Sequence, residues 1–246
     1  MKSEKNKIFD FNKFPAKEGL VIFPISMSRI SNSQSGERYF EFVNQLTKKV
    51  SRGIAGITFL YTDNLYEKYN QSPEISKNRS LGLILSHKNQ FLKNIRIKST
   101  FAENAFDFVV WMQLILNSDD FDNKLSEMKK FYKNDKNFRK YVEEDIKKSK
   151  RKSNEDYINF ILEETLLAYL MLKEETKVPN PYINGRDKWR MICYPGKPNK
   201  SMIYFFQKNI LNLKSGNPYQ NCLYDLEEKK LYDFDKIDLD TFNFQQ

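Results

Sequence analysis

The chain has 246 residues and a formal net charge of +9 at pH 7, with 40% hydrophobic and 15% aromatic residues. This composition excludes a disordered polar chain, and the length suffices for one sizeable core, so we expect a single domain over residues 1–246. The two cysteines, Cys193 and Cys222, are too few for a disulfide scaffold or a cysteine-based zinc site.

The N-terminal residues 1–18 form a polar, Lys-rich lead-in without a long apolar core. No later apolar run reaches the length of a membrane span. We therefore expect a cytoplasmic protein with no membrane partner, and a monomer.

The first predicted element is a buried strand over residues 20–23. This run is short, apolar and continuous, which is typical of a strand buried on both faces of a parallel sheet. The polar residue Ser26 marks the carboxyl end of the strand. Ligands of open α/β sheets bind at that end, so Ser26 is a candidate for chemistry. The alternative is that Ser26, Ser28 and Ser31 only cap turns.

The next predicted elements complete a strand–helix–strand unit. Apolar residues at helical spacing from Phe40 to Val50 predict a crossover helix. Residues 57–61 predict a second buried strand, with Asp63 at its carboxyl end. Strand, helix and strand of these lengths form a βαβ unit, so we predict an α/β fold with a mostly parallel sheet flanked by helices.

The middle of the chain predicts helices. They are a basic helix within residues 77–98, an apolar helix over 108–116, amphipathic helices over 121–132 and 138–146, and a long buried helix from Asn154 to Leu172. Residues 188–194 predict a further strand and residues 202–211 a helix. We expect the C-terminal tail, residues 213–246, to pack on the body and to add an edge strand within residues 223–231.

The chain lacks the residues that several common catalytic mechanisms require. The eight glycines form neither a G-x-G-x-x-G motif nor a Walker loop, so the backbone cradle for a dinucleotide or triphosphate is missing. His87 is the only histidine and is expected on the surface of the basic helix, which argues against a Ser-His-Asp triad or a histidine metal site. We expect no metal and no cofactor, so an enzyme with this sequence would need an already activated substrate.

The positive charge indicates a partner rather than a fold, and nucleic-acid phosphate is the commonest such partner. One cluster falls on or just after the basic helix, where Glu74 is the only nearby acid. Its members are Lys77, Arg79, His87, Lys88, Lys93, Arg96 and Lys98. The alternative interpretation is a Lys-rich surface that is only solvated.

The order and spacing of four short motifs resemble those of the tRNA-dependent cyclodipeptide synthases, over most of residues 18–212. The motifs are the strand ending Ile25-Ser26, the strand Thr58-Phe-Leu-Tyr-Thr-Asp63, the strand Met191-Ile-Cys-Tyr194-Pro195, and the helical stretch 121–149 with Tyr132, Asp135, Phe138 and Val142. The resemblance implies a single Rossmann-like domain similar to the catalytic domain of class I aminoacyl-tRNA synthetases. It also implies two aminoacyl-tRNA substrates that react in ping-pong order to give a diketopiperazine.

The resemblance further implies roles for individual residues. Ser26 would carry the first aminoacyl group as an ester, and Tyr194 with Pro195 would line the same site. An acid late in the long buried helix, which binds the substrate amino group in the family, maps to Glu174 by its distance from Tyr194. We also place Arg29 and Asp63 among the substrate-binding residues. The residues expected to bind tRNA are Lys77, Arg79, Lys88, Lys93 and Arg96.

Two positions depart from the pattern. The larger branch of the family has an asparagine three residues after the serine, where this chain has Arg29, so with Tyr194-Pro195 kept the chain resembles the other branch. The family also has a tyrosine four residues before the helix acid, where this chain has Leu170, with Tyr169 beside it.

Two alternatives therefore stay open. One is a Rossmann-like RNA methyltransferase that uses Asp63 to bind a ribose. The other is a non-catalytic relative that only binds tRNA.

Overall fold

The computed structural model describes residues 20–49, 56–69, 77–98, 106–149, 154–179 and 188–242. Its centre is one six-stranded sheet in the order β3-β2-β1-β4-β5-β6, in which only β6 is antiparallel to its neighbour. The strands are β1 (Leu20–Ile25), β2 (Gly56–Tyr61), β3 (Phe106–Val110), β4 (Trp189–Tyr194), β5 (Cys222–Asp225) and β6 (Lys230–Asp233). The predicted α/β fold with a mostly parallel, helix-flanked sheet is confirmed.

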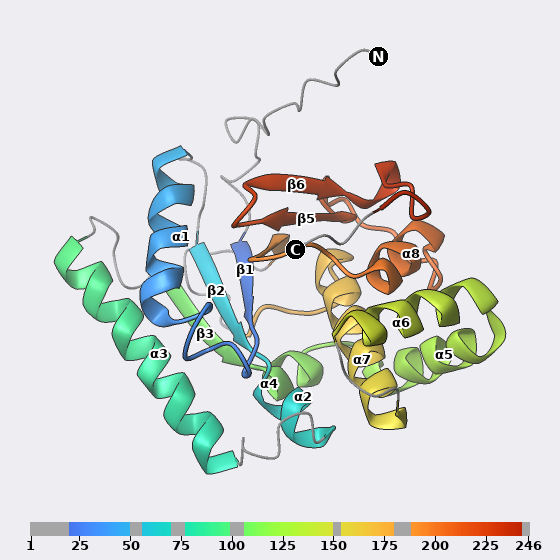
Figure 1. The fold of residues 1–246 in the computed structure, drawn as a ribbon, viewed down its shortest axis with the longest axis horizontal. Coiled ribbons are helices and arrows are strands. Elements are labelled where there is room, and N and C mark those ends of the chain that lie inside the picture. The colour runs from blue at the N-terminus through green and yellow to red at the C-terminus, as the bar shows by residue number, and fades with distance from the viewer. Residues whose placement is uncertain are drawn as a thin grey trace.

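Helices cover both faces of the sheet (Figure 1). On one side lie α1 (Gly36–Lys49) and α3 (Lys77–Lys98), which pack on each other. On the other lie α2 (Asp63–Lys68), α4 (Trp111–Leu116) and α7 (Glu155–Leu172), with α5 (Phe121–Asn134), α6 (Lys136–Lys148) and α8 (Lys200–Lys208) packed around α7. A short 3₁₀ helix, η3 (Phe234–Lys236), packs against α8.

The strand order places a topological switch point between β1 and β4. From β1 the chain crosses over to β2 and β3 on one side, whereas β4 and β5 lie on the other. At such a point the two outgoing connections diverge and leave a crevice at the carboxyl ends of the strands. Ser26 follows β1 and Pro195 follows β4, so both predicted site segments lie at this crevice.

The predicted helix over residues 108–116 is wrong in its first half. Residues 106–110 form β3, which pairs with β2 in the register Phe59↔Phe108, and α4 begins only at Trp111. A short continuous apolar run fits a buried strand and a buried helix equally well, so periodicity does not separate them. Pairing with β2 decides the conformation.

The expected surface position of His87 is also wrong. Its side chain is 1% exposed and contacts the rings of Tyr39 and Phe59. Its Nδ1 is hydrogen-bonded to the Tyr61 hydroxyl at 2.9 Å. Burial lowers the pKa of His87 to about 4, so the ring is neutral at pH 7. His87 shares the inner face of α3 with Phe91, while the basic residues occupy other faces.

The C-terminal segment contributes more to the sheet than one edge strand. Its β5 lies between β4 and β6, and β6 forms the edge. This pair extends the sheet beyond β4 (Figure 1). The lead-in, residues 1–18, lies outside the described residues.

Candidate active site

Three hydroxyl groups meet where β1 ends. Ser26 Oγ lies 2.5 Å from Tyr66 Oη and 3.0 Å from Ser28 Oγ, and Ser28 Oγ lies 3.2 Å from Tyr66 Oη. Each hydroxyl can donate one proton and accept another, so the cluster can pass a proton in either direction. Ser26 is therefore a hydroxyl with a built proton path, which a serine that only caps a turn does not have.

Tyr66 lies on α2, whose start is held against the end of β1. Thr62 ties this start to β1, since both its backbone N and its Oγ1 donate to the Ile25 carbonyl, at 3.1 and 2.9 Å. At the other end of α2, the fully buried carboxylate of Glu163 accepts from Lys68 Nζ and Tyr69 Oη, each at 2.7 Å. Glu163 also accepts from Trp111 Nε1 at 3.0 Å, so one carboxylate joins α2, α4 and α7.

Tyr194 is the last residue of β4, the strand that pairs with β1 on the side away from β2. The turn that follows it is fixed by the buried Asp225, whose Oδ1 accepts from Gly196 N at 3.2 Å. Gly196 has φ +141°, a conformation that suits glycine. Burial raises the pKa of Tyr194 to about 12, the Arg29 guanidinium acts against this rise, and Glu164 and Tyr66 add to it. Tyr194 is thus a neutral donor close to the predicted residue Arg29.

Glu164 is an acid that the sequence prediction did not name. Burial and the neighbouring Asp145 raise its pKa, the Arg29 guanidinium lowers it, and together they bring it to about 7. Because Glu164 also raises the pKa of Tyr194, the two side chains are electrostatic neighbours. A desolvated carboxyl group with a raised pKa is a candidate for holding a substrate ammonium group.

Glu174 does not lie near Ser26. Helix α7 ends at Leu172, and Glu174 sits in the turn behind it with φ +65°. Its carboxylate pairs with Arg190 Nη1 at 2.6 Å and with Lys188 Nζ at 3.4 Å, where β4 begins. Ser26 lies beyond the other end of β1, about 20 Å away at roughly 3.3 Å per strand residue. The structure therefore does not bring Glu174 together with Ser26.

Tyr169 also lies away from the crevice. Its ring is fully buried against Phe205 and Phe206 of α8, and its hydroxyl donates to Asn209 Oδ1. These contacts make Tyr169 part of the core between α7 and α8. An aromatic residue does stand four positions before Glu164: Phe160, whose ring contacts that of Tyr66 at 5.1 Å between centroids.

The remaining predicted substrate-binding residues lie near strand ends. Pro195 is buried directly after β4. Asp63 follows β2, and its Oδ1 accepts from Trp111 N at 3.1 Å, which joins the start of α2 to the start of α4. Burial raises the pKa of Asp63. One oxygen of Asp63 is thus engaged in holding the fold.

The predicted tRNA-binding residues lie along α3, which begins at Lys77. Arg79, Lys93 and Arg96 are exposed. Lys88 is only half-exposed, because its Nζ lies over the Phe108 ring at 4.8 Å from the centroid. The helix therefore presents a basic outer surface to which Lys88 contributes least.

Among the described residues, no three His, Cys, Asp or Glu side chains gather closely enough to hold a metal ion. Within the same ranges, the helices all fall short of the length and apolarity that crossing a membrane requires.

Comparison with known proteins bears on the fold. No family profile matches the chain, and no curated protein matches it by sequence. Solved structures do match. A CDPS (cyclodipeptide synthase) from Fluoribacter dumoffii aligns with a TM-score of 0.56 at 14% identity, covering 86% of this chain and 92% of its own.

Two further solved structures are similar. A cyclodipeptide synthase from Candidatus Glomeribacter gigasporarum, bound to Phe-tRNAPhe, aligns with a TM-score of 0.53 at 18% identity, over 82% of this chain and 87% of its own. One from Bacillus thermoamylovorans aligns with a TM-score of 0.50 at 15% identity, over 85% and 89% of the two chains. The chain has the fold of these structures, and at such identities the likeness concerns the fold alone.

Proposed function

We propose that this protein is a tRNA-dependent cyclodipeptide synthase in which Ser26 is the nucleophile. The observation that carries the proposal is the Ser26 hydroxyl at the switch point, 2.5 Å from Tyr66 and at the end of the sheet where the neighbouring strand β4 ends in Tyr194. The shared fold supports it, since proteins of that fold include one solved with Phe-tRNAPhe. The basic face of α3 supports an RNA partner.

The first half-reaction forms an aminoacyl ester on the enzyme. Ser26 Oγ attacks the ester carbonyl of the first aminoacyl-tRNA, the bond to the ribose oxygen breaks, and that oxygen takes up a proton. The proton lost by Ser26 can travel through the hydroxyls of Tyr66 and Ser28. No histidine is needed, because an aminoacyl-tRNA ester is already activated and the path exists without one.

The second half-reaction needs the amino group of the bound aminoacyl ester. In this proposal Glu164 holds it as an ammonium group, and Tyr194 orients the acyl group. Loss of a proton allows the amine to attack the carbonyl of the second aminoacyl-tRNA, which releases the second tRNA and leaves a dipeptidyl ester on Ser26. The free amine of that dipeptide then attacks the ester carbonyl, which closes the diketopiperazine and returns the proton to Ser26.

Covalent labelling tests the proposal. Wild type, Ser26→Ala and Ser33→Ala are each incubated with radiolabelled aminoacyl-tRNA and denatured before label is measured. Ser33 is the matched control, because it is exposed in the same loop and, among the described residues, its hydroxyl is hydrogen-bonded to Asn32 alone. We expect label on wild type and Ser33→Ala and none on Ser26→Ala, with all three folded, since a lost hydroxyl costs about 1 kcal/mol.

The other results would identify the alternatives. Equal labelling of Ser26→Ala and wild type would contradict the role of Ser26 and make Ser28 the next candidate. No label on wild type, with aminoacyl-tRNA still bound, would favour a non-catalytic tRNA-binding relative. Methyl transfer to RNA would favour the methyltransferase.

A further inference from the structure

A buried aspartate joins the turn after β4 to the turn between β5 and β6. Asp225 ends β5, is 1% exposed, and stands opposite Tyr194 in the parallel pairing of β4 with β5. Its Oδ1 accepts from three backbone N–H groups, at 3.2 Å from Gly196, 2.9 Å from Glu227 and 3.1 Å from Glu228. A buried carboxylate needs such donors, because it has lost its contact with water.

The backbone of Tyr194 belongs to the same junction. Its carbonyl oxygen accepts from Gly196 N at 3.1 Å and from Leu226 N at 3.0 Å. The first of these bonds joins residues two apart and closes a γ-turn with Pro195 at its centre. Proline suits this place, because its ring fixes φ close to the value that the turn requires. Gly196 then continues with φ +141°, where a residue with a side chain would be strained.

The ring of Tyr194 rests against this turn. A Cβ added to Gly196 would lie 3.5 Å from Cε1 and 3.7 Å from Cδ1 of the ring, so one edge of the ring faces the side of Gly196 on which a side chain would lie. A chain of contacts therefore runs from Asp225 Oδ1 through Gly196 to the half-buried Tyr194 ring. Any movement of the turn moves the surface on which the ring rests.

A second connection holds the residue that follows the turn. Lys197 Nζ lies 3.2 Å from Glu228 Oε1, and Glu228 Oε2 accepts from Tyr232 Oη at 2.6 Å. The backbone N of Glu228 is also one of the three donors to Asp225. The segment after β4 is thus tied to both strands of the C-terminal hairpin, β5 and β6.

We propose that Asp225 is a positioning residue that fixes the Tyr194 ring through the turn at Gly196. Asp225 is buried, so it acts through this turn and not by contact with a substrate. A side chain that orients a reacting group must keep one conformation, because a displacement of about 1 Å costs about a hundredfold in rate. The inference rests on the proposed function for what Tyr194 does in the reaction, whereas the fixed ring is a property of the protein alone.

Two substitutions of Asp225 give the sharpest comparison. Asp225→Asn keeps a carbonyl oxygen for the three N–H groups, and because these groups can only donate, they select the oxygen of the new amide. Asp225→Ala leaves the same N–H groups without this acceptor and frees the turn. Glu227→Gln is the control, because it removes a carboxylate from an exposed position of the same hairpin.

Gly196→Ala disturbs the turn from its other side, because alanine is strained at φ +141°. It takes the place of Asp225→Ala if that variant does not fold. Two measurements are made on the full chain of each variant that circular dichroism shows to be folded. The first is the fluorine NMR spectrum with fluorotyrosine at position 194 alone, which reports the surroundings of the ring without tRNA. The second is the kcat and KM of diketopiperazine formation from aminoacyl-tRNA.

We expect one sharp resonance from position 194 in wild type, Glu227→Gln and Asp225→Asn, and a shifted or broadened resonance in Asp225→Ala and Gly196→Ala. In the last two variants kcat should fall by about a hundredfold. The KM for aminoacyl-tRNA should change far less, because the basic surface of α3 is untouched. Asp225→Asn should recover most of the wild-type kcat, since it restores the acceptor.

An unchanged resonance in either Asp225→Ala or Gly196→Ala would overturn the inference. So would an Asp225→Asn resonance displaced as far as that of Asp225→Ala, because the hydrogen bonds to the oxygen would then not hold the turn. If the resonances change as expected while wild type forms no diketopiperazine, the proposed function fails and the positioning of the ring by Asp225 stands. Changed resonances with an unchanged kcat would remove Tyr194 from the reaction.

Discussion

Two opposing effects act on the pKa of the Glu164 carboxyl group. Burial raises the pKa of this carboxyl group to about 7, and the neighbouring Arg29 guanidinium lowers it. Near neutral pH the free protein therefore holds Glu164 in both protonation states. A bound ammonium group would favour the carboxylate and lower its pKa.

A change of Glu164 to Gln tests this role. In wild type, kcat/KM for diketopiperazine formation should rise with pH through about 7, because it reports ionisation in the free enzyme. We expect Glu164→Gln to lose this limb and about ten- to hundredfold in kcat/KM, the usual effect of a hydrogen bond to a charged group. Glu155→Gln, at the exposed start of α7, is the control. A variant with an unchanged pH limb would remove Glu164 from the site.

His87 makes stability depend on pH in a predictable direction. Its pKa is lowered to about 4 by burial, against 6.5 in an unfolded chain, so the unfolded state binds more protons between these values. The stability due to neutral His87 is complete above pH 6.5 and is lost as pH falls. Buried carboxyl groups such as Asp145, whose pKa burial raises to about 6, act in the opposite direction.

Comparison with His87→Gln isolates this contribution. Between pH 7.5 and pH 5, wild type should lose about 2 kcal/mol of unfolding free energy through His87 that the variant does not lose. Urea unfolding at the two pH values measures the difference. Parallel losses in both proteins would mean that His87 is not held neutral by burial.

At the scale of elements, helix α7 carries two adjacent acidic residues, Glu163 and Glu164, with different surroundings. Successive residues of an α-helix point about 100° apart, so Glu163 and Glu164 of α7 face different neighbours. Glu163 joins α2 and α4 to α7 through three hydrogen bonds. The helix thus holds α2, which carries Tyr66, through Glu163, and its Glu164 raises the pKa of Tyr194.

The contact between α1 and α3 depends on a glycine. A Cβ added at Gly36 would lie 2.3 Å from the His87 carbonyl oxygen and 2.8 Å from Phe91 N, both of them backbone atoms. Backbone cannot move aside as a flexible side chain can. The start of α1, just after the loop that follows β1, is therefore set by the absence of a side chain.

Substitution by alanine at two glycines tests this contact. Gly36→Ala should destabilise the protein by about 1–3 kcal/mol, as overpacking does. Gly82→Ala on α3, where nothing lies within 4 Å of the added Cβ, should stabilise it by about 0.5–1 kcal/mol. Thermal unfolding ranks the two variants against wild type. If they rank in the opposite order, the close approach of the helices is not rigid.

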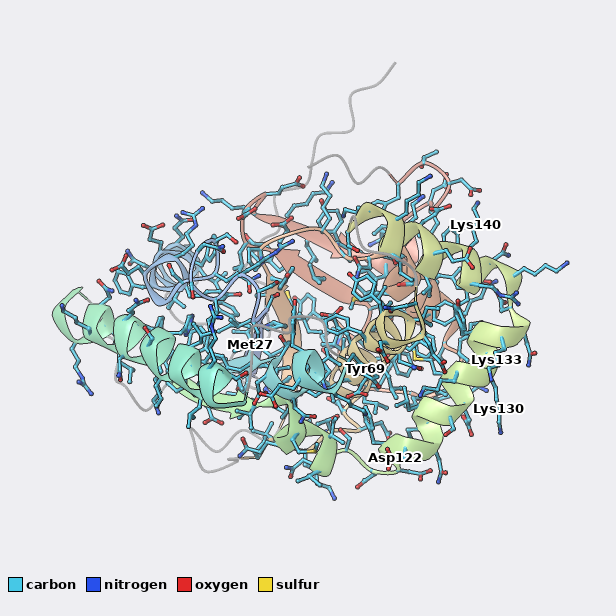
Figure 2. All side chains as sticks on the ribbon, turned by 60° about the horizontal axis from the view of Figure 1, so that its bottom comes forward. Met27, Tyr69, Asp122, Lys130, Lys133 and Lys140 are labelled. Atoms are coloured by element: carbon cyan, nitrogen blue, oxygen red, sulfur yellow. The ribbon has the colours of Figure 1, made fainter. Side chains whose placement is uncertain are left out.

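At the scale of the whole molecule, the basic residues are distributed over separate surfaces. The basic face of α3 lies on the opposite side of the molecule from α5, where Figure 2 shows Lys130 and Lys133 pointing outward. Lys93 and Arg96 on α3 and Lys130 and Lys133 on α5 are all exposed, and the two pairs lie on different surfaces (Figure 1). Partner binding can therefore be assigned to one surface by paired substitutions.

Binding of tRNA should depend on α3. Lys93→Ala with Arg96→Ala should weaken binding and reduce the slope of log K against log salt by up to about 2, roughly one per lost phosphate contact. Lys130→Ala with Lys133→Ala removes the same charge from α5 and should leave the slope near that of wild type. Filter binding over a salt series measures both. Equal slopes for the two variants would make α3 an ordinary solvated surface.

Local pattern in the sequence determined the strand ends and most helices. The run before Ser26, the βαβ unit and the break near Asp135 each follow from residues close together in the chain, and Asp135 indeed accepts from Phe138 N as the N-cap of α6. Ser26 could be proposed from the end of its strand, whereas Tyr194 was proposed from the resemblance to the cyclodipeptide synthases. Their environment could not be read in the same way.

Only the tertiary structure decided which acid lies near Tyr194, which tyrosine contacts Ser26 and which side of α3 is buried. Glu164 and Glu174 are ten residues apart, which is about 15 Å along a helix, and spacing to Tyr194 does not tell which turn of α7 reaches the crevice. Tyr66 reaches Ser26 because two distant segments fix α2: the Ile25 carbonyl of β1 accepts from Thr62, and Glu163 of α7 accepts from Tyr69. His87 is buried because α3 packs that face on the sheet. These outcomes depend on contacts between residues far apart in sequence, which local periodicity does not contain.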